Sequence, residues 1–97
     1  MATVILFSPA ATADLLDIWN YTVSEWGENQ AELYLKELSL VFNKLSEGLI
    51  QGIAIDYVRL GYRKVLAGKH AIYFTQQENE IVIVRILHQR MDVDEVL

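Results

Sequence analysis

Two blocks of helical periodicity, separated by a single glycine, constrain the fold of this chain more than any other feature. In both blocks apolar residues recur three, four and seven positions apart, the spacing that places side chains on one face of a helix. The first face comprises Leu15, Ile18, Trp19, Thr22 and Trp26, and the second comprises Ala31, Leu35, Leu38, Phe42 and Leu45. The first block follows Ser8-Pro9, a favoured helix start, and Gly27 separates the blocks. This short link predicts an antiparallel helical hairpin whose seam is formed by the two apolar faces.

Short runs of strand-forming residues lie on both sides of the predicted hairpin. Thr3–Phe7 predicts a first strand, buried on both faces because the run is apolar throughout. Three later runs, joined by links short enough for hairpins, predict an antiparallel meander at Tyr62–Leu66, His70–Thr75 and Ile81–Leu87. The last run is apolar on both faces except at Arg85, so we expect an interior strand. The fold class is therefore α+β, with the order β-α-α-β-β-β.

Two segments carry no clear pattern. The connection over residues 47–61 contains Gly48 and Gly52 with isolated apolar residues, and its structure is left unassigned. The tail Met91–Leu97 is expected to be either a short helix or an unstructured end.

Length and composition restrict the chain to one domain and exclude several kinds of chemistry. The 97 residues support a single core spanning 1–97, and 53% apolar with 22% charged residues is typical of a soluble globular protein. The absence of cysteine excludes disulfides and thiol nucleophiles. No phosphate-binding loop, Ser–His–Asp set or metal-ligand cluster is present, so we expect no cofactor and no metal. With no signal peptide or membrane span in the sequence, we expect a cytoplasmic protein.

The net charge of −5 is distributed unevenly along the chain. Residues 1–48 hold two basic and seven acidic residues, 49–77 hold four basic and one acidic, and 78–97 hold two basic and five acidic. The acidic total argues against direct binding of duplex nucleic acid. The basic middle segment, with a net charge of +3, could instead hold an acidic peptide or a single phosphate.

A series of short stretches has the order and spacing of one known family. They are Leu6-Phe7-Ser8-Pro9, Ala13-Asp14-Leu15, Ile18-Trp19, Tyr21, Trp26-Gly27-Glu28, Gln30-Ala31, Tyr34-Leu35, Gly61-Tyr62-Arg63-Lys64, Gly68, His70, Ile72-Tyr73-Phe74, and Val84-Arg85-Ile86-Leu87-His88-Gln89-Arg90-Met91-Asp92. Together they resemble the ParE toxins of the RelE/ParE superfamily, the toxin halves of bacterial toxin–antitoxin pairs. One departure is Glu47-Gly48-Leu49-Ile50, where the family usually has an Asn-Pro turn.

The resemblance implies a cytoplasmic, plasmid-stabilising toxin that inhibits DNA gyrase by protein binding and is not an enzyme. It also implies a ParD-like antitoxin, whose disordered acidic or amphipathic tail would fold onto the toxin in a hetero-oligomer. Two alternatives stay open: a RelE-like messenger ribonuclease, and a non-toxic module that only holds an antitoxin.

The ribonuclease alternative depends on Arg63 and Arg90, which match positions where that branch of the superfamily carries phosphate-binding arginines. RNA cleavage through the 2′-hydroxyl also needs a base and an acid. That branch typically has a tyrosine near its C-terminus, whereas residues 91–97 contain no tyrosine and three acids. Like charge would repel phosphate there, so we expect no catalytic residue.

Candidate contact residues fall into two sets. For the target they are Arg63, Arg85, His88 and Arg90, and for the antitoxin they are Trp19, Trp26, Tyr34, Lys69 and Tyr73. Both tryptophans are expected mainly in the core, with an aromatic groove for a partner helix as the alternative.

Three polar residues of the predicted meander have structural interpretations beside the functional ones. Arg85, placed by alternation on the face of Ile81, Ile83 and Leu87, needs an acidic partner, for which Asp14, Asp17 and Asp92 are candidates. His88 is interpreted first as a strand-end histidine hydrogen-bonded to the backbone, with a base or target contact as the alternative. His70 is expected to be structural.

Overall fold

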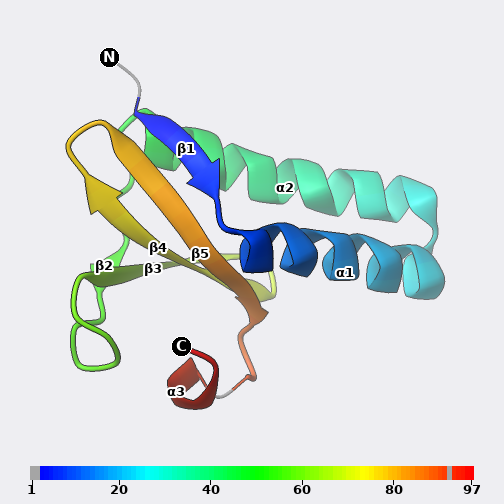
Figure 1. Ribbon diagram of the computed structural model, residues 1–97. Coiled ribbons are helices and arrows are strands. Elements are labelled where there is room, and N and C mark those ends of the chain that lie inside the picture. The colour runs from blue at the N-terminus through cyan, green and yellow to red at the C-terminus, as the bar shows by residue number, and fades with distance from the viewer. Residues whose placement is uncertain (1–2, 92) are drawn as a thin grey trace.

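A helical hairpin packs on one face of a five-stranded sheet in the computed structural model, which describes residues 3–91 and 93–97 (Figure 1). The elements are β1 (Val4–Phe7), α1 (Pro9–Trp26), α2 (Glu28–Ser46), β2 (Ile53–Ala54), β3 (Tyr62–Ala67), β4 (His70–Gln77), β5 (Glu80–His88) and α3 (Val93–Val96). The strand order is β1-β5-β4-β3-β2, with β1 parallel to β5 and the other neighbours antiparallel. The predicted α+β class, the hairpin, the meander and the interior position of β5 are confirmed. Strand β2 adds to the predicted order, and α3 is the short helix that was one of the two alternatives expected for the tail.

The hairpin forms for the reasons that its sequence suggests. Ser8 caps α1 by accepting a hydrogen bond from the Ala11 N–H at 3.0 Å, and Pro9 is the first helical residue. Gly27, with φ of 92°, is the single residue between α1 and α2. The buried residues of the two helices are Ala11, Ile18, Thr22, Ala31, Leu38, Phe42 and Leu45. No helix in the described residues has the length and apolar character needed to cross a membrane.

The prediction that Trp26 lies in the core is wrong, because its side chain is 69% exposed. Trp26 is the last residue of α1, and this end of the hairpin projects beyond the sheet (Figure 1). An apolar helical position is buried only where another element covers it. Trp19, one heptad earlier, is half-buried.

The prediction that the first strand is buried on both faces is also wrong. Strand β1 lies at the sheet edge, beside β5 alone. Its helix-facing side chains pack inward: Ile5 against the main core, and Phe7 edge-on to Phe42 with ring centroids 5.1 Å apart. Val4 and Leu6 point to the opposite face and are 57% and 44% exposed. An apolar run thus marks a strand without showing that both of its faces are covered.

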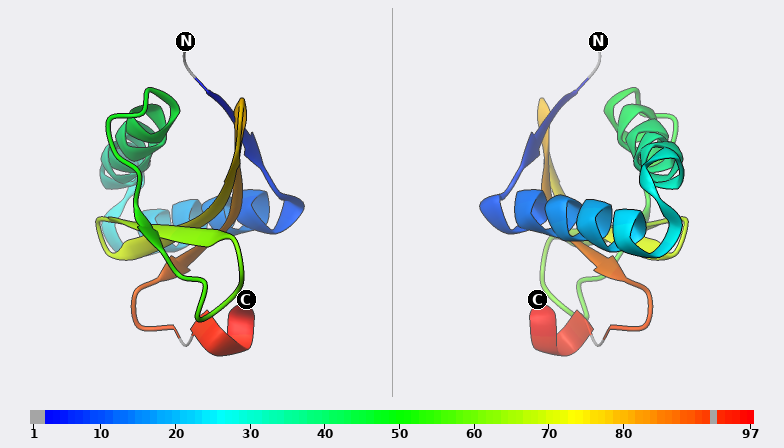
Figure 2. Two further views of the ribbon diagram at one scale, coloured as in Figure 1. Left: turned by 90° about the vertical axis from the view of Figure 1, so that its left-hand side faces the viewer. Right: turned by 90° about the vertical axis from the view of Figure 1, so that its right-hand side faces the viewer.

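Each face of the sheet has its own apolar cluster. The larger one lies between the sheet and the hairpin and includes Leu38, Ile72, Phe74 and Ile83. The smaller one, on the outer face, comprises Ile55, Ala71, Tyr73 and Leu87, with Val58, Tyr62, Val93, Val96 and Leu97 packed against it. The unassigned connection 47–61 therefore supplies both strand β2 and the fully buried Ile55. Figure 2 shows α3 well away from the hairpin, at the lower end of the sheet.

A β-bulge in β5 changes which side chains face the helices. Tyr73 pairs with Arg85 and Phe74 pairs with Ile83, so β5 has one extra residue at this point. Ile83 and Ile86 consequently both belong to the helix-side cluster, whereas Leu87 belongs to the outer one. Placing Arg85 on one face with Ile81 and Ile83 is therefore wrong, because an inserted residue reverses the strand alternation.

Candidate functional site

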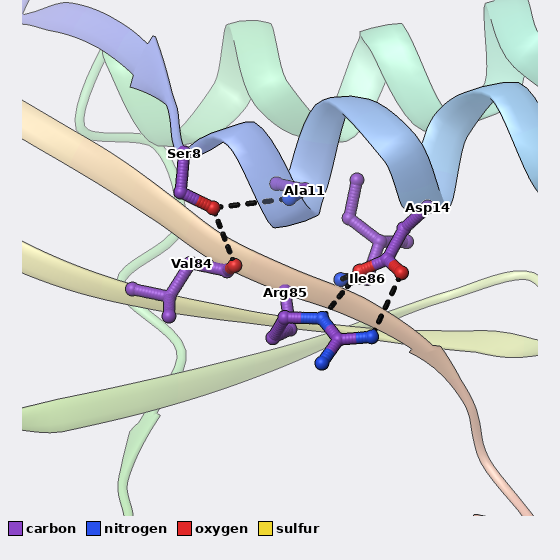
Figure 3. A network of polar contacts seen from close by, with 6 residues as sticks. All are labelled: Ser8, Ala11, Asp14, Val84, Arg85 and Ile86. Atoms are coloured by element: carbon purple, nitrogen blue, oxygen red, sulfur yellow. Dashed lines mark hydrogen bonds and ion pairs between the residues drawn. The ribbon is translucent and has the colours of Figure 1, made fainter. Parts of the chain in front are cut away.

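The start of α1 takes the place of a missing strand along the edge of β5 (Figure 3). Strand β1 ends at Phe7, leaving the C-terminal half of β5 without a strand neighbour on that side. There the Ser8 hydroxyl donates to the Val84 carbonyl at 2.7 Å, and Asp14 Oδ2 accepts from the Ile86 N–H at 2.9 Å. Side chains of α1 thereby satisfy backbone groups that would be costly to bury unpaired.

Asp14 also holds Arg85. The Arg85 Nε donates to Asp14 Oδ2 at 2.8 Å and Nη2 donates to Oδ1 at 2.9 Å, a two-pronged ion pair (Figure 3). The side chains are 26% and 12% exposed, and hydrogen bonding of the Arg85 guanidinium to the Asp14 carboxylate is the main reason that the pKa of Arg85 is raised. The prediction of an internal acidic partner for Arg85 is confirmed. Its charge is thus largely neutralised within the protein.

A groove of about 1100 Å³ lies along α1, the start of α2, the ends of β4 and β5, and the residues after β5. Its lining residues are Asp14, Asp17, Ile18, Tyr21, Thr22, Trp26, Gln30, Tyr34, Lys69, His70, Arg85, Ile86, Leu87, His88, Gln89, Arg90 and Met91. It brings together three target candidates, Arg85, His88 and Arg90, with three antitoxin candidates, Trp26, Tyr34 and Lys69. Exposed aromatic rings and basic side chains therefore share one concave surface.

Two histidines and a tyrosine in the lining of this groove contact one another. Tyr34 Oη accepts from the Lys69 N–H at 3.0 Å and lies 2.5 Å from His70 Nδ1, in a hydrogen bond whose donor is set by the tautomer of the His70 ring. The rings of His70 and His88 stack edge to face, 5.5 Å apart. At the end of β5, His88 Nδ1 accepts from the Arg90 N–H at 3.2 Å. The interpretation of His88 as a strand-end histidine hydrogen-bonded to the backbone is confirmed. The structural role of His70 stays a prediction.

Protonation of His70 is opposed by its surroundings. Burial lowers the pKa of His70 below its usual 6.5, the charge of nearby His88 lowers it further, and Asp14 acts in the opposite direction. The contribution of His70 to stability is therefore fully present at pH values above its unfolded pKa, near 6.5, where the ring is neutral. This contribution is lost as the pH falls from that value through the lower pKa of the folded state.

If neutral His70 carries its proton on Nε2, the Tyr34 hydroxyl is the donor to Nδ1 and stabilises the neutral ring. With this assignment we expect Tyr34→Phe to raise the pKa of His70. NMR titration of the His70 ring protons measures the shift, and Tyr21→Phe, at an exposed tyrosine of the same groove, is the matched control. The wild-type midpoint should lie below 6.5. An unchanged midpoint in Tyr34→Phe would contradict the assigned donor.

Three predicted contact residues lie outside the groove. Arg63 donates through Nε to the Gln51 carbonyl at 2.9 Å and through Nη2 to the Gly52 carbonyl at 3.2 Å, and it lines a separate hollow of about 410 Å³. Tyr73 is only 4% exposed, within the outer cluster. Trp19 is half-buried and does not line the groove.

Sequence reasoning missed Tyr21 and Met91 as parts of this surface. Tyr21 is 66% exposed and Met91 is 48% exposed, and both line the groove. Asp14, Asp17 and Tyr21 are spaced three and four residues apart, a pattern that places them along one side of α1. That spacing could have predicted that Tyr21 shares a surface with Asp14 and Asp17.

The match to known proteins covers almost the whole chain. The family model described as "ParE toxin of type II toxin-antitoxin system, parDE" matches residues 5–93. This chain belongs to the ParE toxin family. The ParE family also supplies close relatives: Toxin ParE1 of Mycobacterium tuberculosis is 45% identical over 95 residues, covering 97% of each chain. Toxin ParE1 of Caulobacter vibrioides is 35% identical over 85 residues, covering 88% of each.

A solved structure has the same fold as this chain. A chain from the "Chromosomal ParDE TA system from P. aeruginosa" superimposes with a TM-score of 0.76 at 20% identity, covering 90% of this chain and 96% of that one. The toxin component of a type II toxin–antitoxin system is thus the class to which this chain belongs.

Proposed function

We propose that this ParE-family toxin inhibits DNA gyrase by binding it, without catalysis, and that a ParD-like antitoxin neutralises it by occupying the groove. Family membership supports the toxin role. One observation supports the proposal that the toxin is not an enzyme: Arg63 and Arg90 line different hollows.

A ribonuclease needs several cations around one phosphate, together with a base and an acid. In this chain Arg63 is committed to two carbonyls of the connection 47–61, and Arg85 is paired with Asp14. Arg90 and Lys69 supply the remaining basic side chains of the groove, which the acidic Asp17 also lines. This distribution favours recognition of a protein surface over stabilisation of a phosphorane.

The groove suits an antitoxin tail with acidic and apolar side chains. Trp26 and Tyr21 offer exposed rings to apolar groups, and Lys69 and Arg90 offer charge to carboxylates. A disordered tail that folds on binding can cover such a long surface at once. The antitoxin partner and the groove therefore match in chemistry.

Inhibition without catalysis follows from differential affinity. A toxin that binds the gyrase state holding cleaved DNA more tightly than the other states raises the population of that state. No covalent step by the toxin is required.

The proposal is tested with purified protein in a gyrase supercoiling assay that also measures cleaved DNA. We expect supercoiling to fall and cleaved DNA to accumulate, and addition of the ParD-like antitoxin to reverse both effects. In cells, induced expression without antitoxin should arrest growth and induce the DNA-damage response while translation continues. Early translational arrest with cleaved transcripts would instead indicate the ribonuclease, and normal growth at verified expression would indicate a non-toxic module.

A further inference from the structure

The residues after β5 fold back into a tight turn. The Met91 N–H donates to the carbonyl of His88, the last residue of β5, at 3.0 Å. A hydrogen bond between residues three apart closes a β-turn, which here has Gln89 and Arg90 at its two central positions. Arg90 and Met91 both line the groove. The position of this turn therefore sets where the charge of Arg90 lies along the groove.

Gln89 joins this turn to the hairpin turn between β3 and β4. Its backbone N–H donates to the Lys69 carbonyl at 3.0 Å, and its side-chain Nε2 donates to the Gly68 carbonyl at 2.9 Å. We refer to these two hydrogen bonds as the clasp. Lys69 also lines the groove. Because Arg90 directly follows Gln89, the clasp brings Lys69 and Arg90 close together at the same end of the groove.

The hairpin turn offers Gln89 two acceptors in fixed positions. The Lys69 N–H donates to Tyr34 Oη at 3.0 Å, which ties the turn to α2. Gly68 has φ of +58°, and a Cβ there would lie 2.7 Å from Tyr34 Cε1 and 2.9 Å from Glu37 Oε2. The lack of a side chain at this position thus lets the hairpin turn pack directly on α2.

The clasp fixes the turn after β5 relative to the groove. Within the described residues, the Arg90 and Met91 N–H groups donate to His88, so these bonds give the turn its shape and do not tie it to another element. The bonds from Gln89 are those that reach the hairpin turn. Since Gln89 is exposed, water can replace its side-chain bond, and this bond adds little to stability. The clasp therefore affects the orientation of the turn more than the stability of the fold.

We propose that Gln89 is a positioning residue of the groove: the clasp holds Arg90 beside Lys69, so that both basic side chains meet the same acidic segment of the antitoxin. This inference rests on the proposed function, in which the antitoxin occupies the groove. A side chain whose backbone is already held in the bound arrangement loses less conformational entropy on binding. Arg90 contacts the antitoxin, and Gln89 acts through Arg90.

Gln89→Met tests the clasp, because methionine has nearly the length of glutamine and no side-chain N–H donor. We expect the affinity for the ParD-like antitoxin, measured by titration calorimetry, to fall about fivefold, the effect of one hydrogen bond, with unchanged thermal unfolding. Gln77→Met is the matched control, since Gln77 is an exposed glutamine of β4 that does not line the groove. Wild-type-like affinity of Gln89→Met would overturn the inference.

NMR relaxation measures the positioning itself, in the toxin without a partner. The heteronuclear NOEs of the Arg90 and Met91 N–H groups should fall in Gln89→Met, while those of β5 stay as in the wild type. Equal rigidity of the turn in the variant and the wild type would show that the clasp does not hold it, and the inference would be lost.

A double-mutant cycle separates positioning from direct contact. If Gln89 acts through Arg90, Gln89→Met should reduce antitoxin affinity much less in an Arg90→Ala background than in the wild type. A loss of the same size in both backgrounds would mean that Gln89 acts independently of Arg90, which contradicts a positioning role.

Other outcomes separate this inference from the proposed function. If the wild-type toxin does not bind the ParD-like antitoxin, the proposed function is wrong, and this inference falls with it. If the wild type binds the antitoxin and Gln89→Met weakens only the inhibition of gyrase, the antitoxin still binds but the clasp serves the target surface. That result overturns the inference alone.

Discussion

Replacing Asp14 by alanine should lower the free energy of unfolding by about 2–3 kcal/mol. The Asp14 carboxylate accepts hydrogen bonds from Arg85 Nε, from Arg85 Nη2 and from the Ile86 N–H. Its removal leaves a half-buried guanidinium and a strand-edge N–H without their acceptor, and the exposure of Arg85 moderates the loss. Urea unfolding of the purified toxin measures the change.

Asp17→Ala is the matched control, since Asp17 is an exposed acid on the same helix. We expect it to change stability by less than about 0.5 kcal/mol. Asp14→Asn, which keeps one acceptor oxygen but carries no charge, should fall between the two. Equal stability of Asp14→Ala and Asp17→Ala would show that the Asp14 network contributes little.

Gly52→Ala should destabilise the fold by about 2–4 kcal/mol, through backbone strain and a steric clash. Gly52 has φ of +66°, which a residue with a side chain rarely adopts. A Cβ placed there would lie 2.6 Å from the Lys64 carbonyl oxygen and 3.2 Å from Phe74 Cε1. The carbonyl belongs to β3, so the connection must shift and release the Arg63 hydrogen bond to the Gly52 carbonyl.

Gly48→Ala separates the two causes, because Gly48 has φ of +75° but open space around its Cβ position. It carries the backbone strain without the clash, so a loss of about 1 kcal/mol is expected. Thermal unfolding of both variants gives the comparison. Similar losses at the two glycines would mean that the connection moves away from β3 at negligible cost.

Much of the fold follows from local pattern. The hairpin was predictable from the Ser8-Pro9 start, the Gly27 break and the apolar spacing, because capping and helical periodicity act over a few residues. The ends of the strands of the meander differ from their predicted ends by no more than two residues, since alternation and short links are also local. The resemblance to ParE toxins, confirmed by the family match, required only the order of short stretches.

The candidate site was only partly predictable. Sequence reasoning named Arg85, His88 and Arg90 together, and the structure places all three along one groove. It also grouped Arg63 with them, although two loop carbonyls hold that side chain elsewhere. The sequence left three candidate acids as the partner of Arg85. The packing of α1 against β5 shows that the partner is Asp14.

The sequence by itself determined the helices, the strands, their order and the family, because these depend on periodicity, capping residues and short links. Only the tertiary structure decided which apolar positions are buried and which polar groups meet. Trp26 is exposed because the hairpin extends past the sheet, and Arg85 changes face because β5 contains a bulge. Burial and pairing depend on contacts between residues distant in the chain, such as Asp14 and Arg85, whose numbers differ by 71, and local pattern does not specify such contacts.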